Sequence, residues 1–184
     1  MKRRALVAIA NGSEELEAVA IIDTLRRAGI DVTVASVESD KLVRASRRVK
    51  IEADELLADC KGRQFDLIIL PGGLPGAEHL RDCEQLTDML KNQAASGMLY
   101  AAICASPAVI LAAHGLLEGK KATCYPGLED KLPDKSAASQ RVVVDGNCVT
   151  SQGPGTAMEF SLKLIELMLG AEKAAEIGSQ MLVR

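Results

Sequence analysis

The sequence predicts an α/β protein in which helices cover both faces of a mostly parallel sheet. Short apolar segments of the length of buried strands alternate along the chain with longer segments of helical periodicity. The first unit is a strand at 4–10, a glycine-containing turn, a helix at 14–28 and a strand at 30–37, which is the order of a parallel βαβ unit. No linker interrupts this alternation, and 184 residues suit one domain, so we expect a single domain over residues 1–184.

The later elements are expected from the same periodicities and from turn residues. In 42–52, basic residues are interspersed with Val and Ile, which fits either a two-stranded excursion or an exposed edge, and we take it as a short strand pair. The remaining expected elements are a short helix at 54–60, a buried strand at 65–70, helical sequence at 77–96, a strand at 99–103, a helix from 107 to 114, a strand at 120–124, a hairpin at 141–150, and helices at 156–169 and 171–183.

Composition narrows the classes of partner. A net charge of −3 and an aromatic content of 2% give no electrostatic or stacking basis for binding nucleic acid. The apolar runs are shorter than a membrane span, and no signal-peptide segment precedes the first strand, so we expect no membrane association and a cytoplasmic location. The five cysteines form no CxxC pair and the chain has two histidines, so we expect reduced thiols, no metal site and no cofactor.

Cys104 lies where an apolar strand changes into a helix, in the segment 99–111 that reads LYAAICASPAVIL. Pro107 suits the first turn of a helix, so we expect Cys104 at a sharp strand-to-helix turn, an elbow of the kind that presents nucleophiles. Such an elbow sets the thiol against the free amides of a helix N-terminus, which predicts a lowered thiol pKa. The alternative is that Cys104 is a small core residue at the end of a strand.

Two further stretches are expected at the same edge of the sheet, because open α/β sheets bind ligands at the carboxyl ends of their strands. One is the turn at 71–76, in which Gly72 and Gly73 either bring bare amides near a ligand or only turn the chain. Its spacing fits neither a dinucleotide fingerprint nor a Walker loop, so phosphate binding is not expected. The other is the start of the first helix, at 11–17.

The two histidines are poor candidates for a base that activates Cys104. His114 lies ten residues further along the same expected helix, about 15 Å away at the standard helical rise. His79 follows the glycine turn and is expected on a solvated helix surface. A Cys-His mechanism is therefore not favoured.

Glu17 is the better candidate for a group that works with Cys104. On a helical wheel it falls beside Ile21 and points to the core, whereas Glu15 falls on the opposite face with Arg26. Partial burial would raise the pKa of Glu17, so that it could donate a hydrogen bond to a thiolate or move a proton. Glu14 and Glu15 fit a surface role that complements the helix dipole.

Six segments together resemble the ThiJ/PfpI superfamily, in its DJ-one branch. The resemblance covers nearly the whole chain and is carried by Arg4-Ala-Leu-Val, Gly12-Ser-Glu-Glu-Leu-Glu17, Arg26-Arg-Ala-Gly-Ile30, Leu70-Pro-Gly-Gly73, Ala101-Ala-Ile-Cys-Ala-Ser-Pro107 and Thr150-Ser-Gln-Gly-Pro-Gly-Thr156.

The resemblance implies a flavodoxin-like sandwich that forms a homodimer. It implies that Cys104 matches the reactive cysteine of the family and Glu17 its partner carboxyl. It also implies that the amides of Gly73 and Ala105, beside Gly72, form an oxyanion-type or substrate-binding pocket. The protease branch is less similar, because it has His directly after the cysteine, where this chain has Ala105. Tyr125 stands where some relatives have a His near the cysteine, which puts histidine-assisted chemistry in question.

Two functional hypotheses follow. In the first, the Cys104 thiolate adds to a small 2-oxoaldehyde and Glu17 moves a proton between adjacent carbons, so that hydrolysis releases a 2-hydroxy acid. The same pair would remove early methylglyoxal and glyoxal adducts from proteins. In the second, the chain is a redox sensor or redox-regulated chaperone in which Cys104 is oxidised without turnover. A thiol beside a hydrogen-bonding carboxyl suits both.

Overall fold

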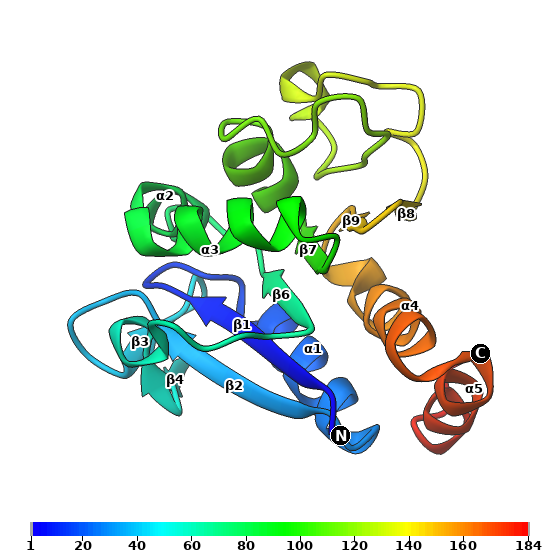
Figure 1. Ribbon diagram of the computed structural model, residues 1–184, viewed down its shortest axis with the longest axis horizontal. Coiled ribbons are helices and arrows are strands. Elements are labelled where there is room, and N and C mark those ends of the chain that lie inside the picture. The colour runs from blue at the N-terminus through cyan, green and yellow to red at the C-terminus, as the bar shows by residue number, and fades with distance from the viewer. Residues whose placement is uncertain (1, 184) are drawn as a thin grey trace.

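The computed structural model describes residues 2–183, which form a seven-stranded sheet with helices on both faces (Figure 1). The strand order is β5-β2-β1-β6-β7-β9-β8, and all neighbours are parallel except the antiparallel pair β8 and β9. The mostly parallel sandwich is therefore confirmed. Its strands are β1 (Arg4–Ile9), β2 (Asp31–Ser36), β5 (Glu55–Leu56), β6 (Leu67–Leu70), β7 (Leu99–Ile103), β8 (Val142–Asp145) and β9 (Cys148–Ser151).

The helices form two layers. On one face α1 packs against α4, and α5 packs on the outside of α4; on the other face α3 packs against α2 and the sheet, and a π-helical turn follows β7. The expected strand pair is also present, as a separate antiparallel ribbon of β3 (Leu42–Arg44) and β4 (Lys50–Glu52). The helices are α1 (Glu15–Arg27), α2 (Gly76–Asp82), α3 (Glu84–Ala95), α4 (Ala157–Leu169), α5 (Ala171–Gln180), the π-helical turn Pro107–Leu111, and short 3-10 turns at Leu57–Cys60, Glu129–Lys131 and Pro154–Thr156.

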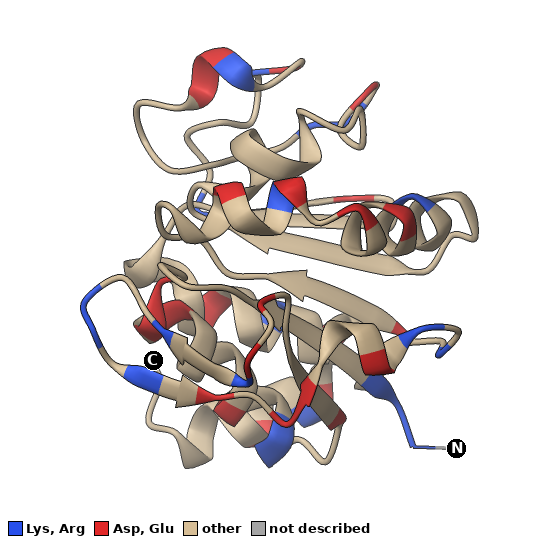
Figure 2. Ribbon diagram, turned by 90° about the vertical axis from the view of Figure 1, so that its left-hand side faces the viewer, with Lys and Arg blue, Asp and Glu red and all other residues tan. Residues whose placement is uncertain are grey.

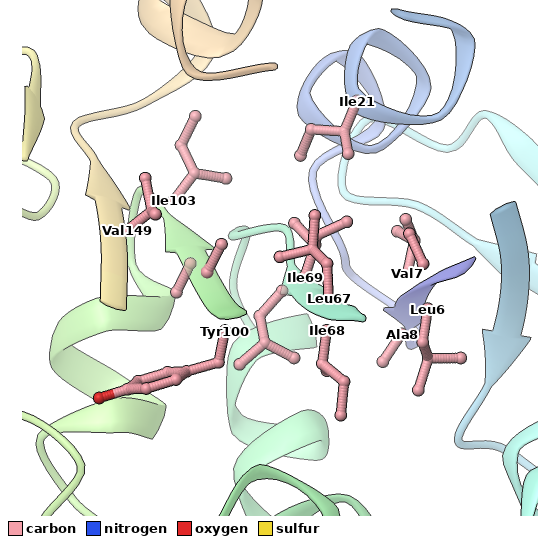
Figure 3. Close-up of a cluster of buried hydrophobic side chains, with 14 of the residues drawn as sticks. Leu6, Val7, Ala8, Ile21, Leu67, Ile68, Ile69, Tyr100, Ile103 and Val149 are labelled. Carbon is pink, nitrogen blue, oxygen red and sulfur yellow. The ribbon is translucent and has the colours of Figure 1, made fainter. Parts of the chain in front are cut away.

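The core lies on both faces of the central strands. β1 is fully buried from Ala5 to Ile9, as expected for a parallel strand between two helical layers. In β6 the side chains of Leu67 and Ile69 point to one face and that of Ile68 to the other, and Ile21 of α1 lies over the first face (Figure 3). The parallel pairing of β6 with β1 and β7 places the carboxyl ends of these three strands side by side at one edge.

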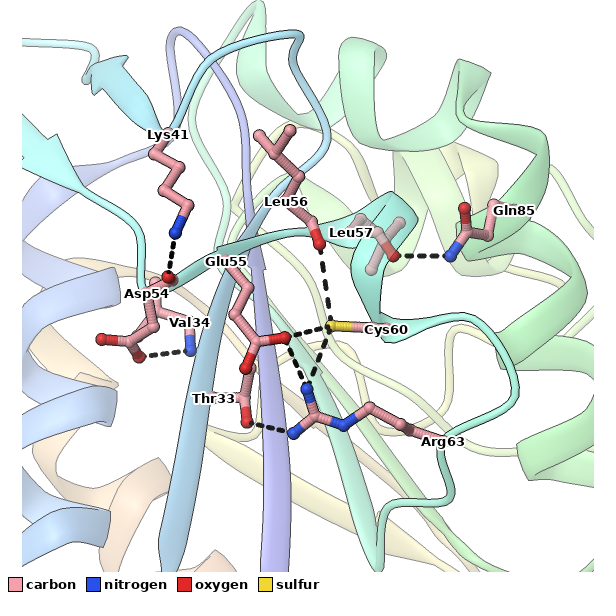
Figure 4. Close-up of polar contacts among 10 residues, drawn as sticks. All are labelled: Thr33, Val34, Lys41, Asp54, Glu55, Leu56, Leu57, Cys60, Arg63 and Gln85. Carbon is pink, nitrogen blue, oxygen red and sulfur yellow. Dashed lines mark hydrogen bonds and ion pairs between the residues drawn. The ribbon is translucent and has the colours of Figure 1, made fainter.

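The segment expected as a helix at 54–60 differs from that expectation. Its first residues form the edge strand β5, which pairs with β2, and only Leu57–Cys60 is helical. The edge strand is pinned by side chains (Figure 4): Arg63 forms an ion pair of 2.5 Å with Glu55 and donates a hydrogen bond of 3.2 Å to Thr33 Oγ1. These contacts come from residues outside the segment, which is why its local pattern was misleading.

Two other expected elements also differ. The helical sequence at 77–96 is two helices, because the backbone of Cys83 is extended between α2 and α3. The segment 120–124, expected as a strand, is irregular. Its backbone amides are satisfied by side chains instead of a neighbouring strand: Lys121 N donates to Asp145 Oδ2 at 2.9 Å, and Thr123 N donates to Thr150 Oγ1 at 2.9 Å.

The surface matches the charge pattern of the sequence. Acidic and basic residues are interspersed over the side of the molecule seen in Figure 2. None of the helices described is long and apolar enough to cross a membrane. Within residues 2–183, no three His, Cys, Asp or Glu side chains are grouped so as to hold a metal ion, and the five cysteines are free thiols.

Candidate active site

Cys104 lies directly after β7 with a backbone φ of 64°, a left-handed conformation that is uncommon for a residue other than glycine. Its strained backbone is fixed by two hydrogen bonds: Cys104 N donates to Ser151 O at 2.9 Å, and Tyr125 N donates to Cys104 O at 2.7 Å. Ser106, two residues after Cys104, contacts the loop after β6 by donating its hydroxyl to Pro71 O at 2.6 Å. The expected strand-to-helix elbow is confirmed.

The glycine turn after β6 packs directly against this elbow. A Cβ atom added to Gly72 would lie 2.5 Å from Cys104 Cβ and 3.0 Å from its sulfur, so only glycine allows the approach. Gly73 has a φ of 89°, and a Cβ there would overlap the backbone of Gly12 and Glu14. The turn is therefore locked between the start of α1 and the elbow, and the amides of Gly73 and Ala105 interact with the Cys104 sulfur.

Glu17 of α1 faces Cys104, as expected from the helical wheel. Its side chain is fully buried, and Gly72 N donates a hydrogen bond of 2.7 Å to its Oε2 atom. Its other oxygen, Oε1, has no hydrogen bond of normal geometry to any group in residues 2–183, although the Cys104 thiol is close enough to affect the pKa of the carboxyl. A buried carboxyl oxygen without a partner favours the protonated form of the acid.

The electrostatics of the two groups are linked. Burial raises the pKa of Glu17 to about 7, against the lowering effect of the Gly72 amide and the Cys104 side chain. Burial, followed by the negative charge of Glu17, raises the pKa of Cys104 to about 12, whereas the amides of Gly73 and Ala105 lower it. The lowered thiol pKa expected from the elbow is thus wrong for a site in which Glu17 is ionised.

The position of one proton decides whether Cys104 is a thiolate. Because the two groups are in contact, loss of the first proton near pH 7 leaves one proton shared between sulfur and carboxyl. When that proton is on Glu17, the carboxyl no longer repels the thiolate, and the amides of Gly73 and Ala105 remain to stabilise it. Near neutral pH, ionisation of Cys104 therefore requires protonation of Glu17.

A cavity of about 490 Å³ opens over Cys104, a size that admits a small molecule. Cys104 itself is 7% exposed. Apolar side chains, among them Leu74 and Leu128, form part of the wall, and the half-exposed ring of Tyr125 also lines it. Arg47 and Glu14 are the charged residues of the lining.

Neither histidine lines this cavity. His79 lies on α2, with its ring half exposed and 3.1 Å from the carboxylate of Glu38. His114 lies between the helices, where its Nε2 atom is 2.9 Å from Arg81 O and 3.2 Å from Thr87 Oγ1. Both positions agree with the expectation that neither ring serves Cys104.

Comparisons with known proteins identify the family of the chain. A family model described as the DJ-1/PfpI family matches residues 3–167. The chain belongs to the DJ-1/PfpI family. It is 51% identical over 183 residues to "Protein DJ-1 homolog B" of Arabidopsis thaliana, which covers 99% of this chain but 42% of that protein. This chain thus spans less than half the length of that plant relative.

Two relatives match over most of their own length. The chain is 39% identical over 163 residues to "Glutathione-independent glyoxalase DJR-1.2" of Caenorhabditis elegans, which covers 88% of this chain and 86% of that protein. Among solved structures, "Toxoplasma gondii DJ-1, oxidized" superposes with a TM-score of 0.96 at 52% identity, covering 98% of each chain. The α/β architecture of this DJ-1/PfpI chain is therefore that of the family.

Glu15 is a residue of this site that sequence reasoning misplaced on the surface. It is 8% exposed, and its carboxylate accepts hydrogen bonds of 2.8 Å from Ser46 Oγ and 2.8 Å from Arg47 N, in the turn between β3 and β4. Burial opposes ionisation of Glu15, but these hydrogen bonds outweigh it and lower the pKa of the carboxyl. Glu14, in contrast, is partly exposed and caps α1 by accepting a hydrogen bond of 2.7 Å from Glu17 N.

Proposed function

We propose that this chain is a cysteine-dependent, glutathione-independent glyoxalase that converts small 2-oxoaldehydes such as methylglyoxal and glyoxal into 2-hydroxy acids. The observation that carries the proposal is the Cys104 thiol facing the buried carboxyl of Glu17, with the amides of Gly73 and Ala105 at the sulfur. The Caenorhabditis elegans relative, which is named a glutathione-independent glyoxalase, supports the same chemistry.

Each proposed step uses groups already at the site. The Cys104 sulfur bonds to the aldehyde carbon, and a proton is taken up by the aldehyde oxygen, which gives a hemithioacetal. Glu17 then removes the proton from that carbon and returns it to the neighbouring carbon, whose carbonyl becomes a hydroxyl while the first carbon becomes a thioester. Water cleaves the thioester, releases the 2-hydroxy acid and restores the thiol, so the net reaction adds one water. Amides of Gly73 and Ala105 stabilise the oxyanions formed on the way.

Formation of lactate from methylglyoxal tests the proposal directly. We expect the purified protein to produce lactate and Cys104→Ser to produce none. Cys83→Ser is the matched control, because Cys83 is a partly exposed free cysteine between α2 and α3 and outside the cavity. Normal turnover by Cys104→Ser, or an equal loss of turnover in Cys104→Ser and Cys83→Ser, would contradict a specific role of Cys104 in the reaction.

The same pair would act on early adducts of methylglyoxal and glyoxal on cysteine, lysine and arginine side chains. These adducts carry the same two-carbon unit as the free aldehyde, bonded to a protein group. We therefore include protein deglycation in the proposed activity. Release of lactate from protein freshly treated with methylglyoxal, after free aldehyde is removed, separates this activity from hydrolysis of the free substrate.

The rival candidate is a redox sensor or redox-regulated chaperone that uses oxidation of Cys104 without turnover. It is favoured by the solved relative from Toxoplasma gondii, which is described as oxidized. Intact and peptide mass after mild peroxide treatment tests this candidate. Addition of oxygen at Cys104 before the other four cysteines supports it, and uniform oxidation counts against it.

We also propose that the chain forms a homodimer through the outer face of α1. Leu16 and Val19, one turn apart on this helix, are 54% and 50% exposed, which is unusual for large apolar residues on one face. Sedimentation at micromolar concentration should give twice the monomer mass of 19.5 kDa, and Leu16→Glu should return the monomer. A monomeric wild-type protein would contradict the proposed dimer.

We also propose a cytoplasmic location for the protein. The cysteines of the described residues are free thiols, which fits a reducing compartment.

A further inference from the structure

The turn between β3 and β4, residues 45–49, is held rigidly over the cavity. Glu15 binds it from below through Ser46 Oγ and Arg47 N, and Arg48 takes a left-handed φ of 72°. The left-handed backbone at Arg48 and the burial of the Glu15 carboxylate both cost free energy, and a short turn between two strands does not require either. Their effect is to hold Arg47 against the cavity that contains Cys104.

The side chain of Arg47 is available for a ligand. Like Arg44 and Arg48 of the same ribbon, it is exposed and forms no ion pair within residues 2–183. Glu14, the acidic residue of the same lining, is occupied by the amide of Glu17 and does not pair with Arg47. A negatively charged group that enters the cavity is therefore attracted to Arg47 and repelled from Glu14.

We propose that Arg47 determines specificity by binding a carboxylate of the substrate while Cys104 reacts with its aldehyde. The proposal rests on the glyoxalase activity proposed above and adds the substrate class: 2-oxoaldehydes with a carboxylate a few carbons from the reactive carbonyl. Such a molecule is 4,5-dioxopentanoate, which with one water gives 2-hydroxyglutarate by the steps already written. The apolar wall formed by Leu74 and Leu128 suits the methylene groups between its two ends.

Two substrates of equal length, one with a carboxylate and one without, isolate the effect of the charge on turnover. The probes are 4,5-dioxopentanoate and 2-oxopentanal, which has a methyl group in place of the carboxylate. We expect the ratio of their kcat/KM values to fall about tenfold in Arg47→Ala, the loss of one moderate charge-assisted hydrogen bond, and to be largely kept in Arg47→Lys. The substitution keeps the backbone amide that Glu15 binds, so the turn is retained.

Arg48→Ala is the matched control. It removes the same charge from the same turn, at a residue that does not line the cavity. An unchanged substrate ratio in Arg47→Ala, or an equal fall in Arg48→Ala, would overturn the proposal, because the effect would then be absent or due to net charge alone.

Alkylation of Cys104 provides a readout that does not depend on turnover. Iodoacetate carries a carboxylate and iodoacetamide does not, so the ratio of their rates at Cys104, followed by peptide mass, should fall in Arg47→Ala and stay at the wild-type value in Arg48→Ala. If this ratio falls but no 2-oxoaldehyde is converted, the glyoxalase proposal fails and the carboxylate site stands. If 2-oxoaldehydes are converted but neither the substrate ratio nor the alkylation ratio changes in Arg47→Ala, the glyoxalase proposal stands and the carboxylate site fails. Failure of both reagents to reach Cys104 would also overturn the site, which requires access for a small acid.

Discussion

Replacing Glu17 by Gln should change how the stability of the protein depends on pH. The folded protein holds the proton of Glu17 with a pKa of about 7, whereas an unburied Glu has a pKa of 4.5. The folded state therefore binds this proton more tightly than the unfolded state. Its contribution to stability is fully present below pH 4.5 and is lost as the pH rises to about 7 and above.

The size of the effect follows from the two pKa values. A change from 4.5 to about 7 corresponds to about 3 kcal/mol, since each tenfold change in an equilibrium constant is about 1.4 kcal/mol. Gln has nearly the same shape as Glu and stays neutral at every pH. Its amide nitrogen can occupy the buried position of Glu17 Oε1, which accepts no hydrogen bond that the substitution would remove. The variant should lose little stability at pH 5 and be more stable than the wild type at pH 8.

Urea unfolding in reducing buffer at pH 5 and pH 8 measures this difference. We expect the free energy of unfolding of Glu17→Gln, relative to wild type, to rise by about 2.5 kcal/mol between the two pH values, since pH 5 already lies above the pKa of an unburied Glu. Glu118→Gln, at an exposed position, is the control for loss of a surface carboxyl and should follow the wild type. Parallel profiles for wild type and Glu17→Gln would refute a raised pKa at Glu17.

Two other substitutions test how the site is held. Gly72→Ala places a Cβ 2.5 Å from Cys104 Cβ, so we expect a loss of about 2 kcal/mol in urea unfolding and altered alkylation of Cys104; an unaffected variant would contradict the close approach. Glu15→Gln weakens the hydrogen bonds to Ser46 and Arg47, which should cost about 2 kcal/mol at pH 7 and expose the β3–β4 turn to proteolysis. Because the pKa of Glu15 is lowered, its contribution is present above pH 4.5 and lost in acid, so wild type and variant should converge as the pH falls.

Much of the architecture is readable from the sequence, because the signals are local. The alternation of buried strands with helices predicts the parallel sheet, and the change of pattern at Cys104 predicts its elbow, which the φ of 64° confirms. The wheel that places Glu17 on the core side of α1 needs only the spacing of apolar residues within one helix.

The features that sequence reasoning missed depend on contacts between distant segments. Glu15 falls on the outer face of α1 by its spacing, and only the folding of the β3–β4 turn over that face buries it. The same turn brings Arg47 to the cavity, a position that nothing local indicates. The segment 120–124 alternates like a strand, but side chains from the β8–β9 hairpin take its amides.

The balance of effects on the thiol pKa of Cys104 also depends on contacts between distant segments. An elbow beside a helix N-terminus favours a thiolate, but the burial of Cys104 and its contact with Glu17 oppose that effect, and neither can be measured from spacing. The one signal in the sequence was the expectation that Glu17 and Cys104 meet. Two acidic groups in contact share a proton, and this sharing now stands at the centre of the proposed chemistry.

The most direct test of that chemistry is lactate formation from methylglyoxal by Glu17→Gln, measured on a preparation whose Cys104 thiolate is titrated by absorbance. The amide can donate a hydrogen bond to the thiolate but cannot carry a proton between carbons. We predict that Cys104 ionises at a lower pH than in the wild type, because the neighbouring charge is gone, while lactate formation is abolished. Normal lactate formation by this variant would contradict the account and show that the proton moves without Glu17.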